Sequence, residues 1–219
     1  MSIRNLWIYG DSLSTGTHGE NAYLDALKKE MDFENFRNFS VGSSGLTEHT
    51  PNSMVSILKK QLADLEPIPE KPDVIFIWHG SNDWYWGSSI GEVLLDDNAS
   101  FAGAIRWVVE NLRAMCPDAL IIWATPIFRL EKPNESDNYG DAFLTPNKNG
   151  NMMGEYVEAL RNASLLLHFP LIEMGQKVNI HMANEADYME DHVHPNAKGY
   201  HKIARVLIRQ IKEYWDIVS

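Results

Sequence analysis

Three side chains of this 219-residue sequence have the types needed for nucleophilic catalysis: Ser12, near one end, and Asp191 and His194, near the other. A serine hydroxyl becomes a good nucleophile when a base accepts its proton, and an imidazole held by a carboxylate is the usual base. Acyl transfer also needs hydrogen-bond donors aimed at the developing oxyanion. Gly42, Asn82 and the N–H of Ser12 itself could supply them. These residues predict an acyl-transfer site assembled from distant parts of the chain.

Short apolar runs, which are typical of strands covered on both faces, alternate with segments of helical spacing. The strand candidates are 6–9, 36–41, 74–78, 120–124 and 169–172, of which 36–41 is the least apolar and a candidate edge. The helix candidates are 23–30, 53–65, 100–115, 156–167 and 196–215. Alternation of strand and helix predicts an α/β fold with a parallel sheet and helices on both faces.

The candidate residues follow the ends of these runs. Ser12 follows the first strand candidate, Gly42 the second and Asn82 the third, while the segment 191–195 directly precedes the last helix candidate. In open parallel sheets, function gathers at the carboxyl ends of the strands. We therefore expect all of these residues to meet at one edge of the sheet.

Four short blocks carry the candidate residues. They are Gly10-Asp11-Ser12-Leu13-Ser14, Asn38-Phe39-Ser40-Val41-Gly42, Gly80-Ser81-Asn82-Asp83 and Asp191-His192-Val193-His194-Pro195. In type and order they resemble the four blocks of the SGNH hydrolase superfamily, the GDSL-type esterases and lipases. The resemblance implies a flavodoxin-like, three-layer α/β/α sandwich around a five-stranded parallel sheet, with residues 1–219 as a single domain. The glycine of the second block could align on Gly42 or Gly45, and we take Gly42, four residues after Asn38.

The resemblance also implies a role for each residue. Ser12 would be the nucleophile, His194 the base, and Asp191 the carboxylate that orients the base. Gly42 and Asn82, with the N–H of Ser12, would bind the oxyanion. No metal and no other cofactor is implied.

Two alternative sites use other residues of the same regions. Asp191, His192 and His194 could bind a divalent metal, but a metal site leaves Ser12 without a role. The segment 87–91 fits the G-x-S-x-G nucleophile elbow, which would make Ser89 the nucleophile. An elbow must follow a strand directly, however, and the nearest strand candidate ends at residue 78.

Two acidic residues flank the proposed catalytic residues. Asp11 precedes Ser12 and Asp83 follows Asn82. They could form a general acid/base pair, but hydrogen bonds that brace the loops are the favoured interpretation.

Aromatic residues indicate where a substrate could bind. Trp84, Tyr85 and Trp86 are consecutive, so they cannot all face a single core. We predict that Trp84 and Trp86 contact the substrate, although core packing could claim some of the three. The segment 125–151 is too long for an ordinary connection. It is expected either to shape the substrate site, with Phe128, Tyr139 and Phe143 as contacts, or to form a disordered surface insertion.

Composition limits the partners. The sequence has 30 acidic and 19 basic residues, and its net charge of −11 disfavours nucleic acids and anionic membranes as partners. Cys116 is the single cysteine, so no intrachain disulfide is possible, and we expect it to be buried. No run suggests a secretory leader or a membrane span, so the expected location is cytoplasmic. No particular oligomeric state is predicted.

The predicted function is that of a serine esterase acting on short-acyl esters of small molecules or carbohydrates. Deacetylation of a carbohydrate is the first candidate, because sugar rings stack on aromatic side chains and the superfamily offers precedents. The same triad would serve an acyltransferase, in which an alcohol resolves the acyl-enzyme. A non-catalytic carbohydrate-binding module is the third interpretation, and the presence of all four blocks argues against it.

Overall fold

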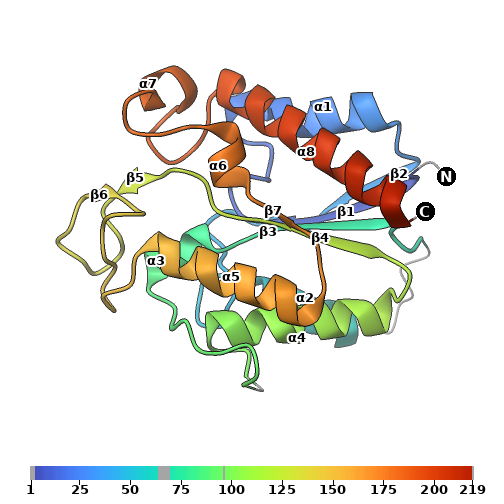
Figure 1. Ribbon diagram of the computed structural model, residues 1–219, viewed down its shortest axis with the longest axis horizontal. Helices are drawn as coiled ribbons and strands as arrows, with labels where there is room; N and C mark the ends of the chain where they lie inside the picture. The colour runs from blue at the N-terminus through green and yellow to red at the C-terminus, as the bar shows by residue number, and fades with distance from the viewer. Residues whose placement is uncertain (1–2, 64–69, 96, 219) are drawn as a thin grey trace.

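The computed structural model of the protein describes residues 3–63, 70–95 and 97–218. A parallel sheet of five strands, in the order β2-β1-β3-β4-β7, forms its centre (Figure 1). The strands are β1 (Asn5–Gly10), β2 (Asn35–Asn38), β3 (Val74–Trp78), β4 (Leu120–Ala124) and β7 (Leu171–Ile172). The predicted parallel sheet is confirmed, and β2 lies at its edge as expected.

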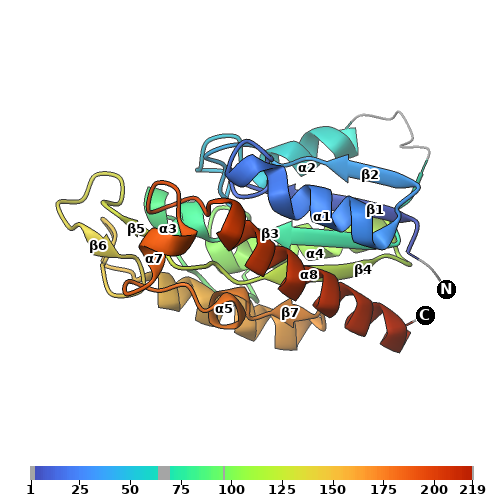
Figure 2. The same ribbon diagram turned by 90° about the horizontal axis from the view of Figure 1, so that it is seen from above.

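Helices cover both faces of the sheet (Figures 1 and 2). One face carries α1 (Ala22–Met31), α6 (Met174–Val178) and α8 (Ala197–Val218). The other face carries α2 (Met54–Ala63), α4 (Phe101–Met115) and α5 (Met153–Leu167). The three-layer α/β/α arrangement is therefore confirmed. The last two residues of the helix predicted at 53–65 lie outside the described residues.

Side chains that alternate along the strands build the two apolar layers. In β1, Trp7 and Tyr9 pack toward α2, α4 and α5, whereas Leu6 and Ile8 pack toward α1 and α8. All residues of β3 are buried, because a central parallel strand is covered on both faces. Cys116 is buried in the first of these layers, as expected.

Two strands are shorter than predicted, for identifiable reasons. In the run 36–41, regular pairing ends at Asn38, whose side-chain Oδ1 accepts a hydrogen bond from the Ser40 N–H. The N–H groups of Phe39 and Val41 still donate to the carbonyls of Ile8 and Gly10 in β1. In the run 169–172, β7 begins at Leu171, because Pro170 has no N–H to donate, although its carbonyl accepts the Trp123 N–H of β4 at 3.0 Å.

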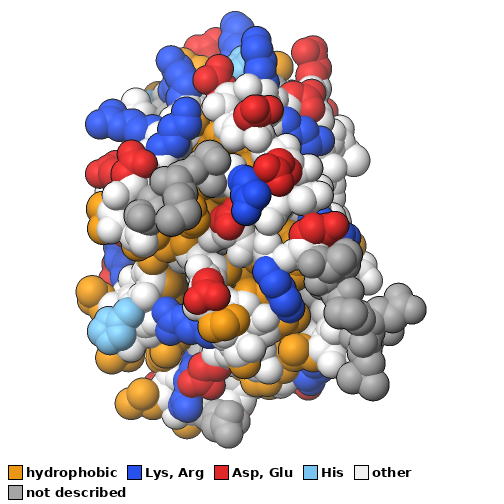
Figure 3. Space-filling view, turned by 90° about the vertical axis from the view of Figure 1, so that its right-hand side faces the viewer, with side chains coloured by type: hydrophobic (Ala, Val, Ile, Leu, Met, Phe, Trp, Pro, Cys, Tyr) orange, Lys and Arg blue, Asp and Glu red, His pale blue; other side chains and the backbone are white. Residues whose placement is uncertain are grey.

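Several short elements, which the sequence pattern did not predict, gather at the carboxyl ends of the strands (Figure 1). They are η1 (Gly19–Asn21), α3 (Ser81–Trp86), α7 (Glu185–Tyr188) and the antiparallel pair β5 (Leu130–Glu131) and β6 (Gly140–Asp141). The opposite end of the molecule carries both termini, and acidic and basic side chains are interspersed over it (Figure 3). Among the described helices, none has the length and apolar character that crossing a bilayer requires.

Candidate active site

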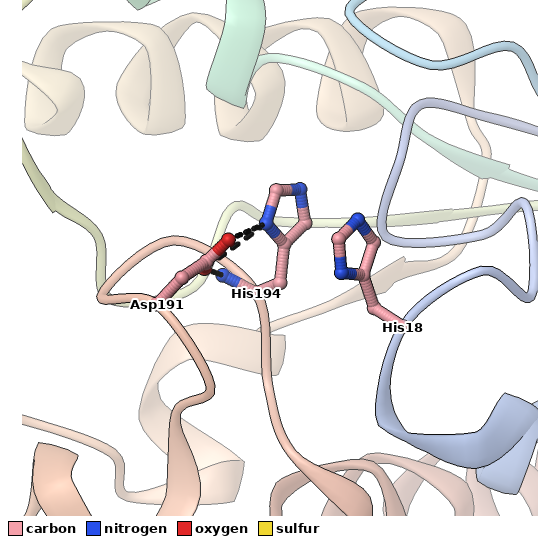
Figure 4. A group of neighbouring side chains, drawn as sticks. All are labelled: His18, Asp191 and His194. Atoms are coloured by element: carbon pink, nitrogen blue, oxygen red, sulfur yellow. Dashed lines mark hydrogen bonds and ion pairs between the residues drawn. The ribbon is translucent and has the colours of Figure 1, made fainter.

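Ser12, His194 and Asp191 form a continuous hydrogen-bonded chain at the carboxyl edge of the sheet. The Ser12 Oγ lies 2.8 Å from the His194 Nε2. On the other side of the ring, Nδ1 lies 2.8 and 3.0 Å from the two carboxylate oxygens of Asp191 (Figure 4). The structure thus brings together the three residues predicted to act as nucleophile, base and orienting carboxylate, in the geometry that activates a hydroxyl group.

Tight local structure holds both sides of this chain. The turn that carries Ser12 is closed by a 2.9 Å hydrogen bond from the Ser14 N–H to the Asp11 carbonyl. On the other side, the Asp191 Oδ1 accepts the backbone N–H of His194 at 2.7 Å and that of Val193 at 3.1 Å. Asp191 therefore fixes the backbone of the loop as well as the imidazole ring.

A second imidazole, which the sequence analysis did not select, lies against the proposed base. The rings of His18 and His194 are stacked, with centroids 3.7 Å apart and an angle of 5° between their planes (Figure 4). Burial lowers the pKa of His194, hydrogen bonding to Asp191 opposes this, and electrostatic interactions with His18 and Arg129 lower it further. These effects together favour the neutral ring, whose Nε2 can accept the proton of Ser12.

The histidines do not form a good metal site. Ligand atoms of His18, Asp191 and His194 lie within 4.8 Å of one another. The lone pairs of stacked imidazoles, however, lie in two parallel planes, so one ion cannot lie in the planes of both rings. His192, a ligand in the metal alternative, has its Nδ1 2.9 Å from the Glu185 carboxylate and a side chain that is 55% exposed. The structure therefore does not bring His192 together with Asp191 and His194, as the metal alternative requires.

The candidate oxyanion donors border the same cavity as Ser12. Gly42 is exposed and lines this cavity of about 650 Å³ together with Ser12 and Asn82. Gly45 is buried, and its N–H donates to the Thr50 Oγ1 at 3.1 Å. The alignment on Gly42 thus agrees with the geometry better than the alternative on Gly45.

The Asn82 amide is almost completely buried behind the cavity. Its Nδ2 donates to the Ser44 carbonyl at 2.9 Å and has a longer contact, 3.4 Å, with the Asp11 Oδ2. Its Oδ1 accepts a hydrogen bond from the Arg129 Nη1 at 2.9 Å. One N–H of the amide is thus firmly engaged, and the second is held only weakly.

The prediction for the aromatic residues is half wrong. Trp84 is fully buried in the apolar layer between the sheet and the helices α2, α4 and α5. Its Nε1 donates to the Thr145 carbonyl at 3.2 Å, and its side chain does not line the cavity. A substrate contact for Trp84 is therefore excluded. Trp86 lines the cavity, as does Tyr85, which was not selected. Because all three residues lie on α3, successive side chains turn by about 100° and face different surroundings.

The segment 125–151 does shape the site, but through charged rather than aromatic residues. Arg129 and Glu131, at β5, line the cavity. Phe128 is buried, Phe143 packs on the core and Tyr139 is 63% exposed, and none of the three lines the cavity. Opposite charges two residues apart, shortly after a strand, were the signal available in the sequence for Arg129 and Glu131.

Two buried carboxyl groups brace the loops of the site. Asp83 accepts hydrogen bonds from the backbone N–H groups of Leu46 and Thr47, at 2.8 to 3.2 Å. The Asp11 Oδ1 accepts the Leu13 N–H at 2.9 Å. Burial raises the pKa of Asp11 to about 7 and that of Asp83 to about 6. These contacts are the loop-bracing hydrogen bonds favoured from the sequence.

Comparison with known proteins agrees with the predicted resemblance. The sequence model of the GDSL-like lipase/acylhydrolase family matches residues 8–202. No curated protein sequence matches the chain.

Solved structures share the fold at low sequence identity. A protein from Lactobacillus plantarum is 21% identical, with a TM-score of 0.81 over 97% of this chain and 98% of that one. A possible lipase from Chitinophaga pinensis is 19% identical, with a TM-score of 0.68 over 96% and 99%. The lipase/acylhydrolase from Enterococcus faecalis is 17% identical, with a TM-score of 0.62 over 97% of each chain.

The buried carboxyl group of Asp11 should make stability depend on pH. Its pKa rises from an ordinary 3.8 to about 7 on folding, so the folded state binds the proton more tightly than the unfolded state. This contribution to stability is full below about pH 4 and is lost as the pH rises through about 7. Asp11→Asn should therefore flatten the fall in Tm over this range. The exposed Asp118→Asn is the matched control, and an unchanged slope for Asp11→Asn would contradict the assignment.

The two tryptophans should respond differently to truncation. Trp84→Ala should lower the free energy of unfolding by about 3–5 kcal/mol, because it leaves a large cavity in the core. Trp86→Ala, at the cavity surface, should cost less than half as much and should raise KM for an ester substrate. Urea unfolding and steady-state kinetics measure the two effects, and equal destabilisation by both substitutions would refute this distinction.

Proposed function

Because the chain belongs to the GDSL-like lipase/acylhydrolase family and is therefore a hydrolase, we propose that it is a serine esterase with Ser12 as nucleophile. The observation that carries the proposal is the hydrogen-bonded chain from the Ser12 Oγ through His194 to Asp191. Its links have the lengths of ordinary hydrogen bonds, and the central imidazole favours the neutral form, as a general base must.

In the proposed mechanism, the Ser12 Oγ attacks the ester carbonyl carbon while the His194 Nε2 takes the hydroxyl proton. The oxyanion accepts hydrogen bonds from the N–H groups of Ser12 and Gly42 and from the Asn82 amide. As the bond to the alcohol breaks, His194 returns its proton to the leaving oxygen. A water molecule, deprotonated by the same imidazole, then hydrolyses the acyl-enzyme and regenerates Ser12. Asp191 stabilises the imidazolium in both halves of the reaction.

We propose short-acyl esters as substrates, with acetylated carbohydrates as the first candidates, and the cavity lining supports a polar alcohol portion. Tyr85 and Trp86 offer aromatic surface for a sugar ring. Thr15, Thr17 and Glu131 offer partners for hydroxyl groups. The net charge of −11 also favours an uncharged, water-soluble ester over a nucleic acid or an anionic lipid surface.

Ser12→Ala should lower kcat for p-nitrophenyl acetate by more than about 1,000-fold, because loss of a nucleophile removes the covalent route. Its Tm should stay close to that of the wild type, since the Ser12 side chain is only partly buried. Ser89→Ala is the matched control: Ser89 is exposed and lies outside the cavity, so activity should not change. Residual activity of Ser12→Ala above about a thousandth of the wild-type rate would contradict the assignment of Ser12 as the nucleophile.

His18 should set the pH dependence of the reaction. Since burial and electrostatic interaction with His18 both lower the pKa of His194, the acid limb of kcat/KM should lie below the ordinary histidine value of about 6.5. His18→Ala exposes the His194 ring and removes this interaction, so the acid limb should move to higher pH. His192→Ala serves as the control, because His192 pairs with Glu185 away from the cavity. A limb that stays in place in His18→Ala would contradict this account.

A further inference from the structure

Arg129 lies outside the four sequence blocks, yet its guanidinium group reaches the centre of the site. The side chain is almost completely buried, at 7% exposure, and borders the cavity. Its Nη1 donates to the Asn82 Oδ1 at 2.9 Å and to the Ser81 Oγ at 3.1 Å. Its Nε and Nη2 donate to the Glu131 carboxylate, with the Nε bond at 2.7 Å. The guanidinium thus links the β5 strand to the start of α3.

These contacts determine the orientation of the Asn82 amide. An amide side chain can be turned by 180° with little change in shape, which exchanges its acceptor oxygen with its donor nitrogen. A guanidinium can only donate, so the Asn82 oxygen must face Arg129. The Ser44 carbonyl can only accept, so the amide nitrogen must face the opposite side, at 2.9 Å from the Ser44 oxygen. Arg129 and Ser44 therefore select the same one of the two orientations.

Arg129 has few donors left for direct contact with a substrate. Its guanidinium already serves Asn82, Ser81 and Glu131. A substrate carboxylate could bind it only by displacing Glu131, which holds the opposite edge of the group. The guanidinium also lies 4.9 Å from the centre of the Tyr85 ring, a contact that further limits its movement.

We propose that Arg129 is a positioning residue that acts through Asn82. It holds the amide with one N–H on the Ser44 carbonyl and with the other, which has only the 3.4 Å contact to the Asp11 Oδ2, left to donate to the oxyanion. Through its charge-assisted hydrogen bond to the amide oxygen, it also makes this N–H a stronger donor. The proposal rests on the proposed esterase function, in which Asn82 is an oxyanion donor. Glu131 fixes the position of the Arg129 guanidinium by accepting hydrogen bonds from its Nε and Nη2.

The test is a double-mutant cycle between Arg129 and Asn82. Arg129→Lys keeps the charge but cannot bridge Asn82 and Glu131, and it should lower kcat for p-nitrophenyl acetate by about 10- to 100-fold, with KM changed by less than about threefold. Asn82→Ala should lower kcat by about 100-fold or more, as loss of an oxyanion donor does. In the double variant, Arg129→Lys should cost less than about a further threefold, because residues that act as a unit are not additive.

Matched variants separate this role from general stabilisation. Arg161, which pairs with Glu158 and Glu173 and does not line the cavity, provides Arg161→Lys as the control, with kcat unchanged. If Asn82→Ala does not fold, Asn82→Asp replaces it in the cycle, because its carboxylate still accepts from Arg129 but has no N–H to donate. Tm is measured for every variant.

Three results would overturn the proposal. Fully additive losses in the cycle would mean that Arg129 acts independently of Asn82. A change in KM alone would indicate direct substrate binding, and a lower Tm with unchanged kcat would indicate a structural brace. Labelling of Ser12 by a fluorophosphonate tests the proposed function separately: if Ser12 is labelled and essential while the cycle is additive, only the role of Arg129 fails.

Discussion

The hydrogen bond between the Ser12 Oγ and the His194 Nε2 joins residues 182 positions apart in the sequence. The turn at Ser12 leads toward α1, and the loop of His194 leads directly into α8. These two helices pack side by side on the same face of the sheet, where the Tyr23 and Tyr200 rings stack with centroids 5.6 Å apart (Figures 1 and 2). The pairing of α1 with α8 is thus the packing event that delivers the proposed base to the proposed nucleophile.

The oxyanion side of the site depends on a different support, a set of buried polar groups. Asp83 ties the loop after β2 to α3, and Asp11 holds the turn that carries Ser12. Burying a carboxylate costs free energy unless hydrogen bonds replace the lost water. Backbone N–H groups compensate only in part, since burial still raises the pKa of both groups. The loops are therefore held in place at some cost in stability at neutral pH.

The positions of the strands and the members of the Ser12, His194 and Asp191 chain were predictable from the sequence, because both are encoded locally. Apolar runs mark buried strands, and each block sits at a strand end or a helix start. The order of the strands in the sheet was not predicted, because it depends on contacts between distant parts of the chain. Trp84 was assigned wrongly, since consecutive aromatics do not reveal which helical face is buried. His18 and Arg129 were not selected because their roles come from tertiary approach. His18 gains its role because the segment before η1 brings its ring against that of His194. Arg129 gains its role because β5 approaches α3, where its guanidinium reaches Asn82.

The two supports act on different parts of the site, and a backbone hydrogen bond joins them: the Leu130 N–H of β5 donates to the His192 carbonyl, in the loop of His194, at 3.0 Å. The nucleophile and base depend on α1 and α8, whose packing belongs to the core of the fold. The Asn82 amide contacts Arg129, which lies in the segment between β4 and α5, outside the central sheet. Residues of this segment also line the cavity. Because loops outside a rigid scaffold tolerate sequence change better than the core does, variation in this segment could alter substrate preference and the environment of the proposed oxyanion donor together. The Ser12–His194 hydrogen bond would be affected only where such variation disturbs the bond between the Leu130 N–H and the His192 carbonyl.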